Sequence, residues 1–406
     1  MKYLVMLGDG MADWPVPELS GRTPLEAAAH PNMDFLAQHG VCGLARTVPE
    51  GMPPGSDTAN LSVFGYDPKI CYSGRSPLEA VNMGIPLNAR DVTYRANTVT
   101  LTGDTVESSV MTDYSAGEIP SEESRILIAD LAKELCRDGL ELYPGVSYRH
   151  CLVLRDAEDG AELTPPHDIP GRPVAEYLPK GTNADLLRGL MEHSYDFLRR
   201  HPLNAQRERE GKNPANCLWF WGEGRKPQLA SFTEKYGIQG GVISAVDLIH
   251  GIGRCAGLLS IPVDGKITGN CHTDFAAKSR AAIRAFDTMD FVYLHVEAPD
   301  ECGHHNELRE KVWSIEQIDG QVLGPVLDAL RARGEDFAVL LMPDHPTPMA
   351  IRTHAPDPVP FTLFDTRRNT SGAARFTEKD CKETGLFVPA AHTLMDSLIL
   401  GREVRA

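Results

Sequence analysis

The sequence lacks any long hydrophobic run. No segment approaches the about 18 consecutive apolar residues of a membrane-spanning helix. The apolar stretch Tyr3–Leu7 ends at once in Gly8-Asp9-Gly10, which is too short for the core and cleavage site of a signal peptide. We therefore expect no signal peptide, no membrane partner and a cytoplasmic location.

Cysteine pairs and basic runs are also missing. The 9 cysteines are scattered and form no CxxC pair, which argues against a disulfide framework and a zinc knuckle and favours reduced thiols. Asp and Glu number 56 against 40 Lys and Arg, a formal net charge of −16. Because phosphate contacts need clustered Lys and Arg, we expect no nucleic-acid partner. A small anionic substrate would need a local basic pocket.

Several catalytic signatures are absent. The sequence has neither a GxxxxGK[ST] loop nor the kinase signature set, so a kinase of the usual kind is disfavoured. Gly8-Asp9-Gly10 is not a GxGxxG fingerprint, which leaves little support for a dinucleotide enzyme. A sulfatase is disfavoured because no CxPxR pattern occurs at the candidate nucleophile loop.

Three short apolar runs, each followed by an acidic residue, are the clearest structural signal. They are Tyr3–Leu7, Phe291–Val296 and Phe337–Met342. Continuous apolar runs rich in β-branched residues are typical of strands buried on both faces of a parallel sheet.

Helical patterns lie beside these runs. Pro24–His39 has apolar residues near helical spacing but is interrupted by Pro31, which splits it in two. Ile315–Arg333 reads as one amphipathic helix, and Val388–Leu400 as a final helix. Alternating strands and helices predict an α/β fold, a mostly parallel sheet flanked by helices that binds ligands at the carboxyl ends of its strands.

The middle of the chain has a different character. Alternating polar and apolar residues at Val92–Val99 suggest antiparallel strands, and Leu163–Pro173 is a loop rich in Pro and Gly. At 406 residues, two or three domains, or one domain with an insertion, are expected. We therefore predict a discontinuous domain of residues 1–87 and 237–406, with an α+β domain inserted at 88–236.

Acidic residues follow the three predicted strands. Asp9, Asp300 and Asp344 would meet at one edge of the sheet if the strands are parallel neighbours. Convergent carboxylates repel one another and are costly to desolvate, so they need cations.

Histidines accompany these carboxylates. His304 completes a DxxxH spacing with Asp300, His345 adjoins Asp344, and His354 follows nine residues later. A single histidine near a strand end is usually a hydrogen-bonding loop residue. Three histidines beside three strand-end aspartates favour a site for Mn²⁺ or Zn²⁺.

A candidate nucleophile lies in the stretch from Glu50 to Ser62, where a Pro/Gly loop meets a predicted helix start. Ser56 would lie at or near the N-cap, and a purely structural capping role is compatible with catalysis. Backbone N–H groups at a helix N-terminus suit a phosphate, and a metal would activate the hydroxyl.

Together these residues resemble a known family. Asp9, the Gly55–Asn60 loop, Asp300-x-x-x-His304, Asp344-His345 and His354 are similar to the metal and nucleophile set of cofactor-independent (2,3-bisphosphoglycerate-independent) phosphoglycerate mutases. The likeness is to the shorter archaeal-type branch, and the stretches Pro54–Ala80 and His295–His304 strengthen it. The resemblance implies an alkaline-phosphatase-like core of that superfamily, with the insertion serving as a substrate-binding lid.

The resemblance also implies two metal sites and a reaction. One metal would be held by Asp300, His304 and His354, and the other by Asp9, Ser56, Asp344 and His345. Ser56 would take the phosphate of 3-phosphoglycerate and return it to the 2-hydroxyl, in an intramolecular phosphotransfer without 2,3-bisphosphoglycerate. Mn²⁺ is the favoured metal, and Zn²⁺ or Co²⁺ would fit the same ligands.

Further residues are assigned to the substrate. Lys278 is expected beside the phosphate, and Asp168 is a candidate general acid or base. Basic groups of the insertion should hold the carboxylate and phosphate. The candidates are Arg149, His150, His167 and Arg225, whose alternative role is that of solvated surface groups.

Other functions remain open on the sequence. Pro214–Gly222 and Met342–Pro348 resemble a bacterial subgroup that has been proposed to act as an alternative homoserine kinase. A related phosphotransferase or phosphatase would use the same metals and Ser56 with a different pocket. An inactive metal-binding scaffold is disfavoured because all the candidate ligands are present. The sequence does not define an oligomeric state.

Overall fold

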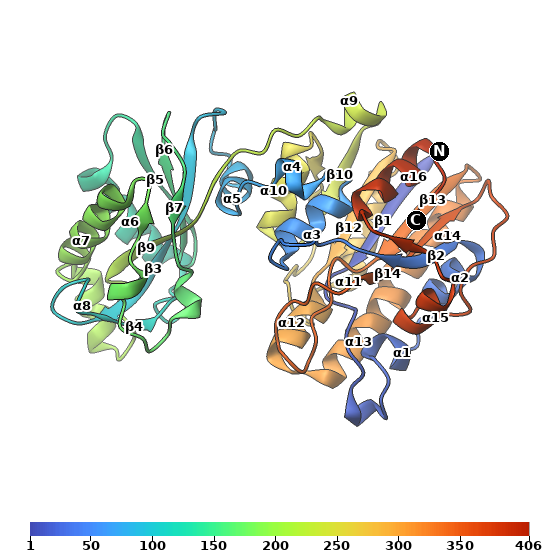
Figure 1. Ribbon diagram of the computed structural model, residues 1–406, viewed down its shortest axis with the longest axis horizontal. Coiled ribbons are helices and arrows are strands. Elements are labelled where there is room, and N and C mark those ends of the chain that lie inside the picture. Colours follow the sequence, from blue (N-terminus) through green and yellow to red (C-terminus); the bar gives the residue numbers. More distant parts are fainter. Residues whose placement is uncertain (406) are drawn as a thin grey trace. The chain divides into compact units, whose positions relative to one another are not determined.

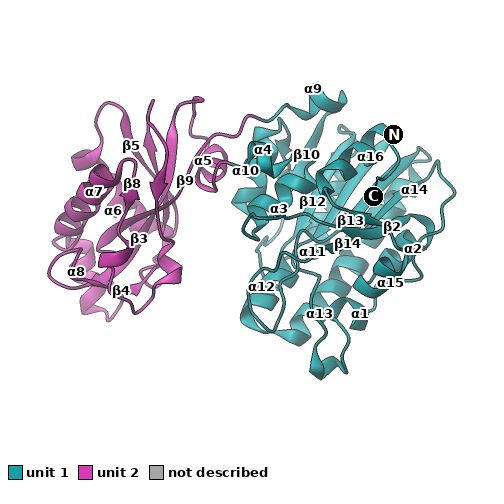
Figure 2. Cartoon of the chain, in the orientation of Figure 1, with its two compact units in different colours: residues 1–72, 229–406 teal, residues 73–228 magenta. Residues whose placement is uncertain are grey.

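A computed structural model describes residues 1–405 of the chain. It forms two compact units (Figure 2). Unit 1 comprises Met1–Tyr72 together with the chain from Leu229 onward, and unit 2 comprises Ser73–Gln228.

The borders of unit 2 differ from the predicted 88–236. Helix α5 (Ser76–Asn82) packs on strands β3 (Val92–Thr102) and β9 (Cys217–Arg225), which places it in unit 2. Helix α9 (Phe232–Tyr236) belongs to unit 1, where the Phe232 amide donates to Ala256 O at 2.8 Å.

The core of unit 1 is one large sheet (Figure 1). Within residues 1–405 its strands lie in the order β11 (Leu259–Ser260), β10 (Gly240–Ile243), β12 (Phe291–Val296), β1 (Lys2–Gly8), β13 (Phe337–Met342), β14 (Val359–Asp365), β2 (Val41–Ala45) and β15 (Phe387–Val388). In that range, β14 runs antiparallel to its neighbours and the other strands are parallel. The predicted α/β class with a mostly parallel sheet is confirmed.

The three apolar runs are the centre of this sheet. Strands β12, β1 and β13 are parallel neighbours, and Leu7 of β1 is level with both His295 and Met342. The runs are continuous because both faces are covered: every residue of β12 and β13 is buried. Their carboxyl ends therefore meet at one edge, as predicted.

Alternate residues of these strands face two helical layers. Leu4 and Met6 pack with α2 (Pro31–His39), α11 (Phe275–Ala285), the π-helix η4 (Ile318–Leu323) and α14 (Gly324–Ala332). On the other face lie α3 (Ser56–Val63), α10 (Asp247–Cys255) and α16 (Leu394–Leu400), and Tyr293 stacks on Phe64 at a ring-centroid distance of 3.8 Å.

Two helix predictions need correction. The predicted helix Ile315–Arg333 is helical from Ile315 to Ala332, but it changes from α13 (Leu308–Gln317) to the π-helical η4 before α14 begins. The predicted start of the last helix at Val388 is wrong, because Val388 pairs with Ala45 in the sheet and Pro389 follows. The split at Pro31 is confirmed, since Pro31 opens α2.

Shorter elements complete unit 1. They are η1 (Pro17–Leu19), α1 (Pro24–Ala27), α4 (Pro68–Cys71), α12 (Ala298–His305), α15 (Glu378–Glu383) and η5 (Ala391–Thr393).

Unit 2 is built on an antiparallel sheet. Its strands are β3, β4 (Val110–Asp113), β5 (Leu140–Val146), β6 (Arg149–Leu154) and β9, with β7 (Ala161–Glu162) and β8 (Lys180–Gly181) as a separate pair. Helix α6 (Ser121–Leu135) packs on β5, and α7 (Ala184–Leu198) on β9. The remaining helices of this unit are α8 (Pro202–Arg209), η2 (Pro166–Asp168) and η3 (Ala175–Tyr177).

A hydrophobic core joins α6 and α7 to one face of this sheet, and α5 packs at the other face. Across residues 1–405, every helix is too short or too polar to cross a bilayer.

Candidate metal centre

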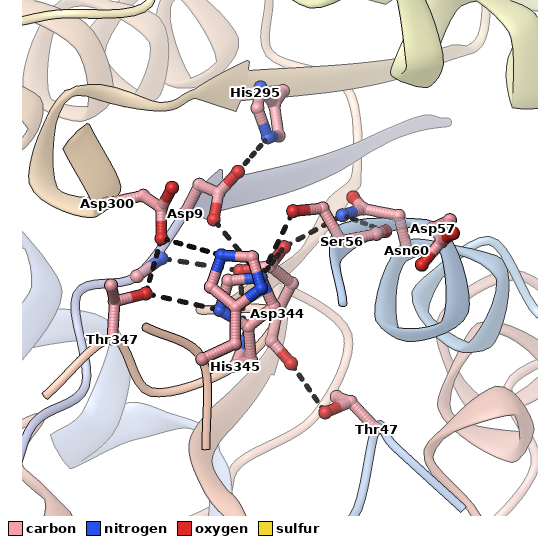
Figure 3. A network of polar contacts seen from close by, with 12 residues as sticks. Asp9, Thr47, Ser56, Asp57, Asn60, His295, Asp300, Asp344, His345 and Thr347 are labelled. Atoms are coloured by element: carbon pink, nitrogen blue, oxygen red, sulfur yellow. Dashed lines mark hydrogen bonds and ion pairs between the residues drawn. The ribbon is translucent and has the colours of Figure 1, made fainter. Parts of the chain in front are cut away.

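The strand ends of unit 1 gather a cluster of carboxylates and imidazoles (Figure 3). Asp9 follows β1, Asp344 follows β13, and Asp300 lies in the first turn of α12, just beyond β12. The parallel order β12-β1-β13 brings these three segments together, although 291 residues separate Asp9 from Asp300 along the chain.

Two groups of possible metal ligands result. In each group, one ligand atom per residue lies within 4.8 Å of the others. Asp300, His304 and His354 form the first group, and Asp9, Asp344 and His345 form the second. A further carboxylate group, Asp9, Glu297 and Asp300, connects them.

The side chains of the first group direct their nitrogen and oxygen atoms toward one point. His304 Nε2 lies 3.0 Å from His354 Nε2 and 3.2 Å from Asp300 Oδ2. Burial would raise the pKa of Asp300, but hydrogen bonds with His304 and His354 hold that pKa well below its usual range. His304 Nδ1 is 3.0 Å from the carbonyl oxygen of Arg352; as a donor there, it leaves an Nε2 lone pair for a metal.

The second group is fully buried. Asp344 Oδ2 accepts from Asn60 Nδ2 at 2.8 Å, while its Oδ1 accepts from the amides of Gly10 and His345 at 3.3 and 2.9 Å. Asp9 Oδ2 lies 2.9 Å from His295 Nε2, but Asp9 Oδ1 is buried without a hydrogen-bond partner.

This second group fits a cation. Burial, reinforced by the carboxylates of Asp344, Asp300 and Glu297, raises the pKa of Asp9 well above its ordinary value. A divalent ion would offset that repulsion and give Asp9 Oδ1 a partner. Mixed carboxylate and imidazole donors suit Mn²⁺, Zn²⁺ or Co²⁺.

Ser56 lies beside the second group. It is the first residue of α3, and its Oγ is 3.1 Å from His345 Nε2. Asn60, one turn along the helix, donates to Ser56 O at 2.9 Å as well as to Asp344, so α3 is tied to the strand-end carboxylates. Figure 3 shows Ser56, His345 and Asp344 directed toward one another.

Lys278 lies behind this cluster. Its buried ammonium donates to His295 O at 3.0 Å. Burial lowers the pKa of Lys278 to about 8, against the opposing effect of Glu297 and Asp9. The predicted place of Lys278, on the metal-bearing domain, therefore brings it within electrostatic range of Asp9.

The other candidates belong to unit 2, and their surroundings differ. The side chains of His167 and Asp168 are 46 and 59 % exposed and lie 3.7 Å apart. Arg149 is exposed. Arg225 donates to Arg90 O and Ala157 O at 2.7 and 2.8 Å and pairs with Asp159, so its guanidinium is engaged within the fold.

His150 is buried beneath Arg149. Its Nδ1 accepts from the Gly145 amide at 3.1 Å, while its Nε2 has no hydrogen-bond partner. Burial lowers the pKa of His150 to about 3, so the ring is neutral near pH 7.

Two arginines of unit 2 that lie near the predicted Arg149 were missed. Arg75 and Arg95 each place Nε 3.0 Å from the Glu79 carboxylate, and Arg149 is near enough to help lower the pKa of Glu79 against the effect of burial. Arg95 also lies over Trp221, at 4.2 Å from the ring. The spacing of Arg75 and Glu79, four residues apart at a helix start, is the one local signal that could have suggested this cluster.

Asn60, His295 and Thr347 were also missed as contacts of the candidate ligands. Asn60 and His295 lie within stretches that carried the resemblance, and Thr347 lies within Met342–Pro348. Nothing local shows that a helix asparagine, a strand histidine or a loop threonine points inward.

Comparisons with known proteins agree with the predicted family. Residues 37–204 match the family model described as 2,3-bisphosphoglycerate-independent phosphoglycerate mutase. A probable enzyme of that name from Geobacter sulfurreducens is 50 % identical, over 98 % of this chain and 100 % of the relative. Another from Methanothrix thermoacetophila is 49 % identical, over 99 and 100 %.

Two solved structures share the fold. The PH0037 protein from Pyrococcus horikoshii matches with a TM-score of 0.82 and 30 % identity, over 100 % of this chain and 99 % of that one. A cofactor-independent phosphoglycerate mutase from Thermoplasma acidophilum matches with a TM-score of 0.66 and 26 % identity, over 98 and 99 %.

These relationships define the class, an α/β isomerase with a mostly parallel core. The chain belongs to the family of 2,3-bisphosphoglycerate-independent phosphoglycerate mutases, as the sequence motifs predict.

Proposed function

We propose that the chain interconverts 3-phosphoglycerate and 2-phosphoglycerate through a phosphoserine at Ser56, without 2,3-bisphosphoglycerate. The observation that carries the proposal is the position of Ser56. Its Oγ lies at a helix N-terminus, 3.1 Å from His345 of the second ligand group, in a chain of the mutase family. A cytoplasmic location belongs to the same proposal.

The proposal includes two divalent metal ions, with Mn²⁺ favoured. Asp300, His304 and His354 would hold one, and Asp9, Ser56, Asp344 and His345 the other. Bound there, the ions would neutralise phosphate charge and favour the alkoxide form of Ser56.

The reaction is a pair of displacements. Ser56 Oγ attacks phosphorus, the bond from phosphorus to O3 breaks, and O3 gains the proton that Ser56 loses. The 2-hydroxyl of the retained glycerate then attacks the phosphoserine and gives its proton back to Ser56. The N-terminal amides of α3 are suited to the phosphate, and Asp168 is our candidate for carrying the proton. Water must be excluded while the phosphoserine exists, since hydrolysis would make the protein a phosphatase.

Unit 2 takes the substrate-binding role in this proposal. Three guanidinium groups surround the carboxylate of Glu79, those of Arg75, Arg95 and Arg149. The ring of His167 makes a T-shaped contact with Trp221, at a centroid distance of 5.1 Å. This surplus of positive charge suits a carboxylate or phosphate. Arg225 and the buried His150 support the unit structurally and are less suited to contact the substrate.

An enolase-coupled assay tests the function. Purified protein is given 3-phosphoglycerate and Mn²⁺ without 2,3-bisphosphoglycerate, and a parallel sample contains EDTA. We expect turnover that EDTA abolishes and Mn²⁺ restores. Absence of turnover with Mn²⁺, Co²⁺ and Zn²⁺ would exclude the mutase reaction, and homoserine with a phosphate donor would be the next substrates to test.

A further inference from the structure

Thr347 lies between the two ligand groups. It follows β13 by a few residues, on the same loop as His345, and it is fully buried. In Figure 3 its hydroxyl faces both Asp300 and His345. The loop from Asp344 to Thr347 thus carries side chains that touch both groups.

The hydroxyl makes two polar contacts. Thr347 Oγ1 donates to Asp300 Oδ1, a member of the first group. The same oxygen lies 3.3 Å from Nδ1 of His345, a member of the second group. A single buried oxygen therefore connects ligands proposed for different metals.

The protons in this arrangement can be assigned. A threonine hydroxyl has one proton, and the Asp300 carboxylate accepts it. Toward His345 the oxygen can then only accept, so Nδ1 carries the ring proton of the neutral imidazole. The lone pair is left on Nε2, which faces Ser56 Oγ at 3.1 Å and Asp9 Oδ1 at 3.7 Å.

The position of Thr347 is held by a hydrogen bond to its carbonyl oxygen and by close packing. Lys311 Nζ donates to Thr347 O at 2.8 Å and to Asp13 Oδ2 at 2.7 Å, in a pair whose side chains are at most 1 % exposed. A Cβ on Gly10 would lie 2.7 Å from Thr347 Oγ1, and one on Gly303 would lie 2.6 Å from Thr347 O. The threonine cannot withdraw from the ligands without disturbing this packing.

We propose that Thr347 is a positioning residue of the metal centre: its hydroxyl orients Asp300 and holds His345 in the tautomer whose Nε2 lone pair points at the second metal position. The inference rests on the proposed function, because it takes the two groups as metal sites. Groups that orient a metal ligand commonly change metal affinity by about 10–100-fold when they are removed.

Calorimetric titration of the metal-free protein with Mn²⁺ tests this. Thr347→Val removes the hydroxyl at nearly constant shape, and Thr347→Ala provides a second deletion should valine disturb folding. We expect both to bind Mn²⁺ about 10–100-fold more weakly than the wild type, with Thr347→Ser restoring most of the affinity. The matched control is Thr362→Val in β14. It also deletes a buried hydroxyl, which donates to Leu36 O at 3.1 Å. It should keep wild-type affinity.

The outcomes separate the two proposals. A wild type that binds two Mn²⁺ beside a Thr347→Val variant of equal affinity would overturn the positioning role and leave the proposed function intact. An equal loss in Thr347→Ser and Thr347→Val would also overturn it, since packing would then be the cause. A wild type that binds no Mn²⁺ would overturn both the inference and the metal sites on which it rests.

Discussion

Ser56 is the residue on which the proposed chemistry depends most directly. Replacing it with alanine removes the only group that would carry the phosphate, so we expect turnover to fall by about 10³-fold or more. The other proposed ligands remain, so Mn²⁺ content measured by mass spectrometry should stay within about twofold. Ser62→Ala is a control on the same helix, because it deletes a hydroxyl whose hydrogen bond, to Thr47 O at 2.5 Å, goes to the backbone and not to a proposed ligand. That variant should lose about 1 kcal/mol of stability and keep its activity. Full activity of Ser56→Ala would exclude the phosphoserine.

Two arginines of unit 2 should behave differently. Arg149 belongs to the cluster around Glu79, whereas the guanidinium of Arg225 is engaged with Arg90 O, Ala157 O and Asp159. We expect Arg149→Ala to raise the KM for 3-phosphoglycerate about tenfold or more and Arg225→Ala to lower thermal stability with little change in KM. Steady-state kinetics and melting curves distinguish the two effects. A KM defect confined to Arg225→Ala would reverse the assignment.

At the scale of elements, the N-terminus of one helix is capped by a side chain of another helix. Helix α2 begins at Pro31, and its N-cap residue His30 provides no capping side chain. Asp319, on the π-helix η4, supplies the acceptors instead: its Oδ1 accepts from the Met33 amide at 2.8 Å and its Oδ2 from the Asn32 amide at 3.2 Å. The cap thus joins segments nearly 290 residues apart in the sequence.

Asp319→Ala should therefore destabilise unit 1 without changing the kcat of the folded protein. Loss of a capping side chain costs about 0.5–2 kcal/mol, and we expect the upper part of that range because Asp319 is buried. Urea unfolding measures the loss, and Asp319→Asn, which keeps one acceptor, should lose less. A large drop in kcat of the folded variant would contradict a purely structural role.

The sequence predicts elements where a local pattern decides them. The apolar runs of β1, β12 and β13 are buried on both faces, so their composition alone identifies them, and Pro31 marks the split between α1 and α2. Val388 was misassigned because its place in the sheet depends on pairing with Ala45, which no local pattern contains.

The candidate ligands were predictable for a related reason. Asp9 and Asp344 each lie two residues beyond the end of a predicted strand, so parallel neighbours suffice to bring them together. Arg95 was not predictable, because it meets Glu79 only once β3 lies against α5, and Thr347 could not be distinguished from any other loop threonine.

At the scale of the whole molecule, unit 2 should respond to acid through His150. Burial lowers the pKa of His150 to about 3 in the folded state, against about 6.5 when unfolded. The unfolded state therefore binds the extra proton between pH 6.5 and 3. The free energy of unfolding is therefore unaffected by His150 above pH 6.5. It falls as the pH decreases toward 3, by up to about 1.4 kcal/mol per pH unit.

Urea unfolding measures this dependence when it is followed by fluorescence in a Trp14→Phe, Trp313→Phe background, because the two remaining tryptophans, Trp219 and Trp221, lie in unit 2. His150→Asn keeps an acceptor for the Gly145 amide but does not titrate, so its stability should fall less steeply between pH 7 and 5. Identical slopes in the two proteins would show that His150 is not the group responsible.

Unit 2 should also fold when separated from the rest of the chain. Its hydrophobic core consists of its own residues, because α6 and α7 cover one face of a sheet whose strands all lie between Ser73 and Gln228. A domain of about 150 residues buries roughly 68–70 % of the surface of its unfolded chain, enough for independent stability. The two ends of the unit meet, since Ser73 Oγ donates to Arg225 O and a Cβ on Gly224 would lie 2.1 Å from Ser73 O. Excision therefore cuts the chain at adjacent points and leaves the sheet whole.

We expect a fragment of residues 73–228 to show a cooperative melting transition and dispersed amide resonances, and to have no mutase activity because it lacks Ser56 and the strand-end carboxylates. Gly224→Ala in the same fragment should lower its melting temperature, because the added methyl group would separate the two terminal segments. Gly189→Ala is the matched control: it lies in α7, where a Cβ would meet nothing within 4 Å, and alanine there should raise stability by about 0.5–1 kcal/mol. A fragment without a cooperative transition would mean that the core of unit 2 depends on unit 1, and the insertion would then be an extension of the catalytic domain instead of a domain in its own right.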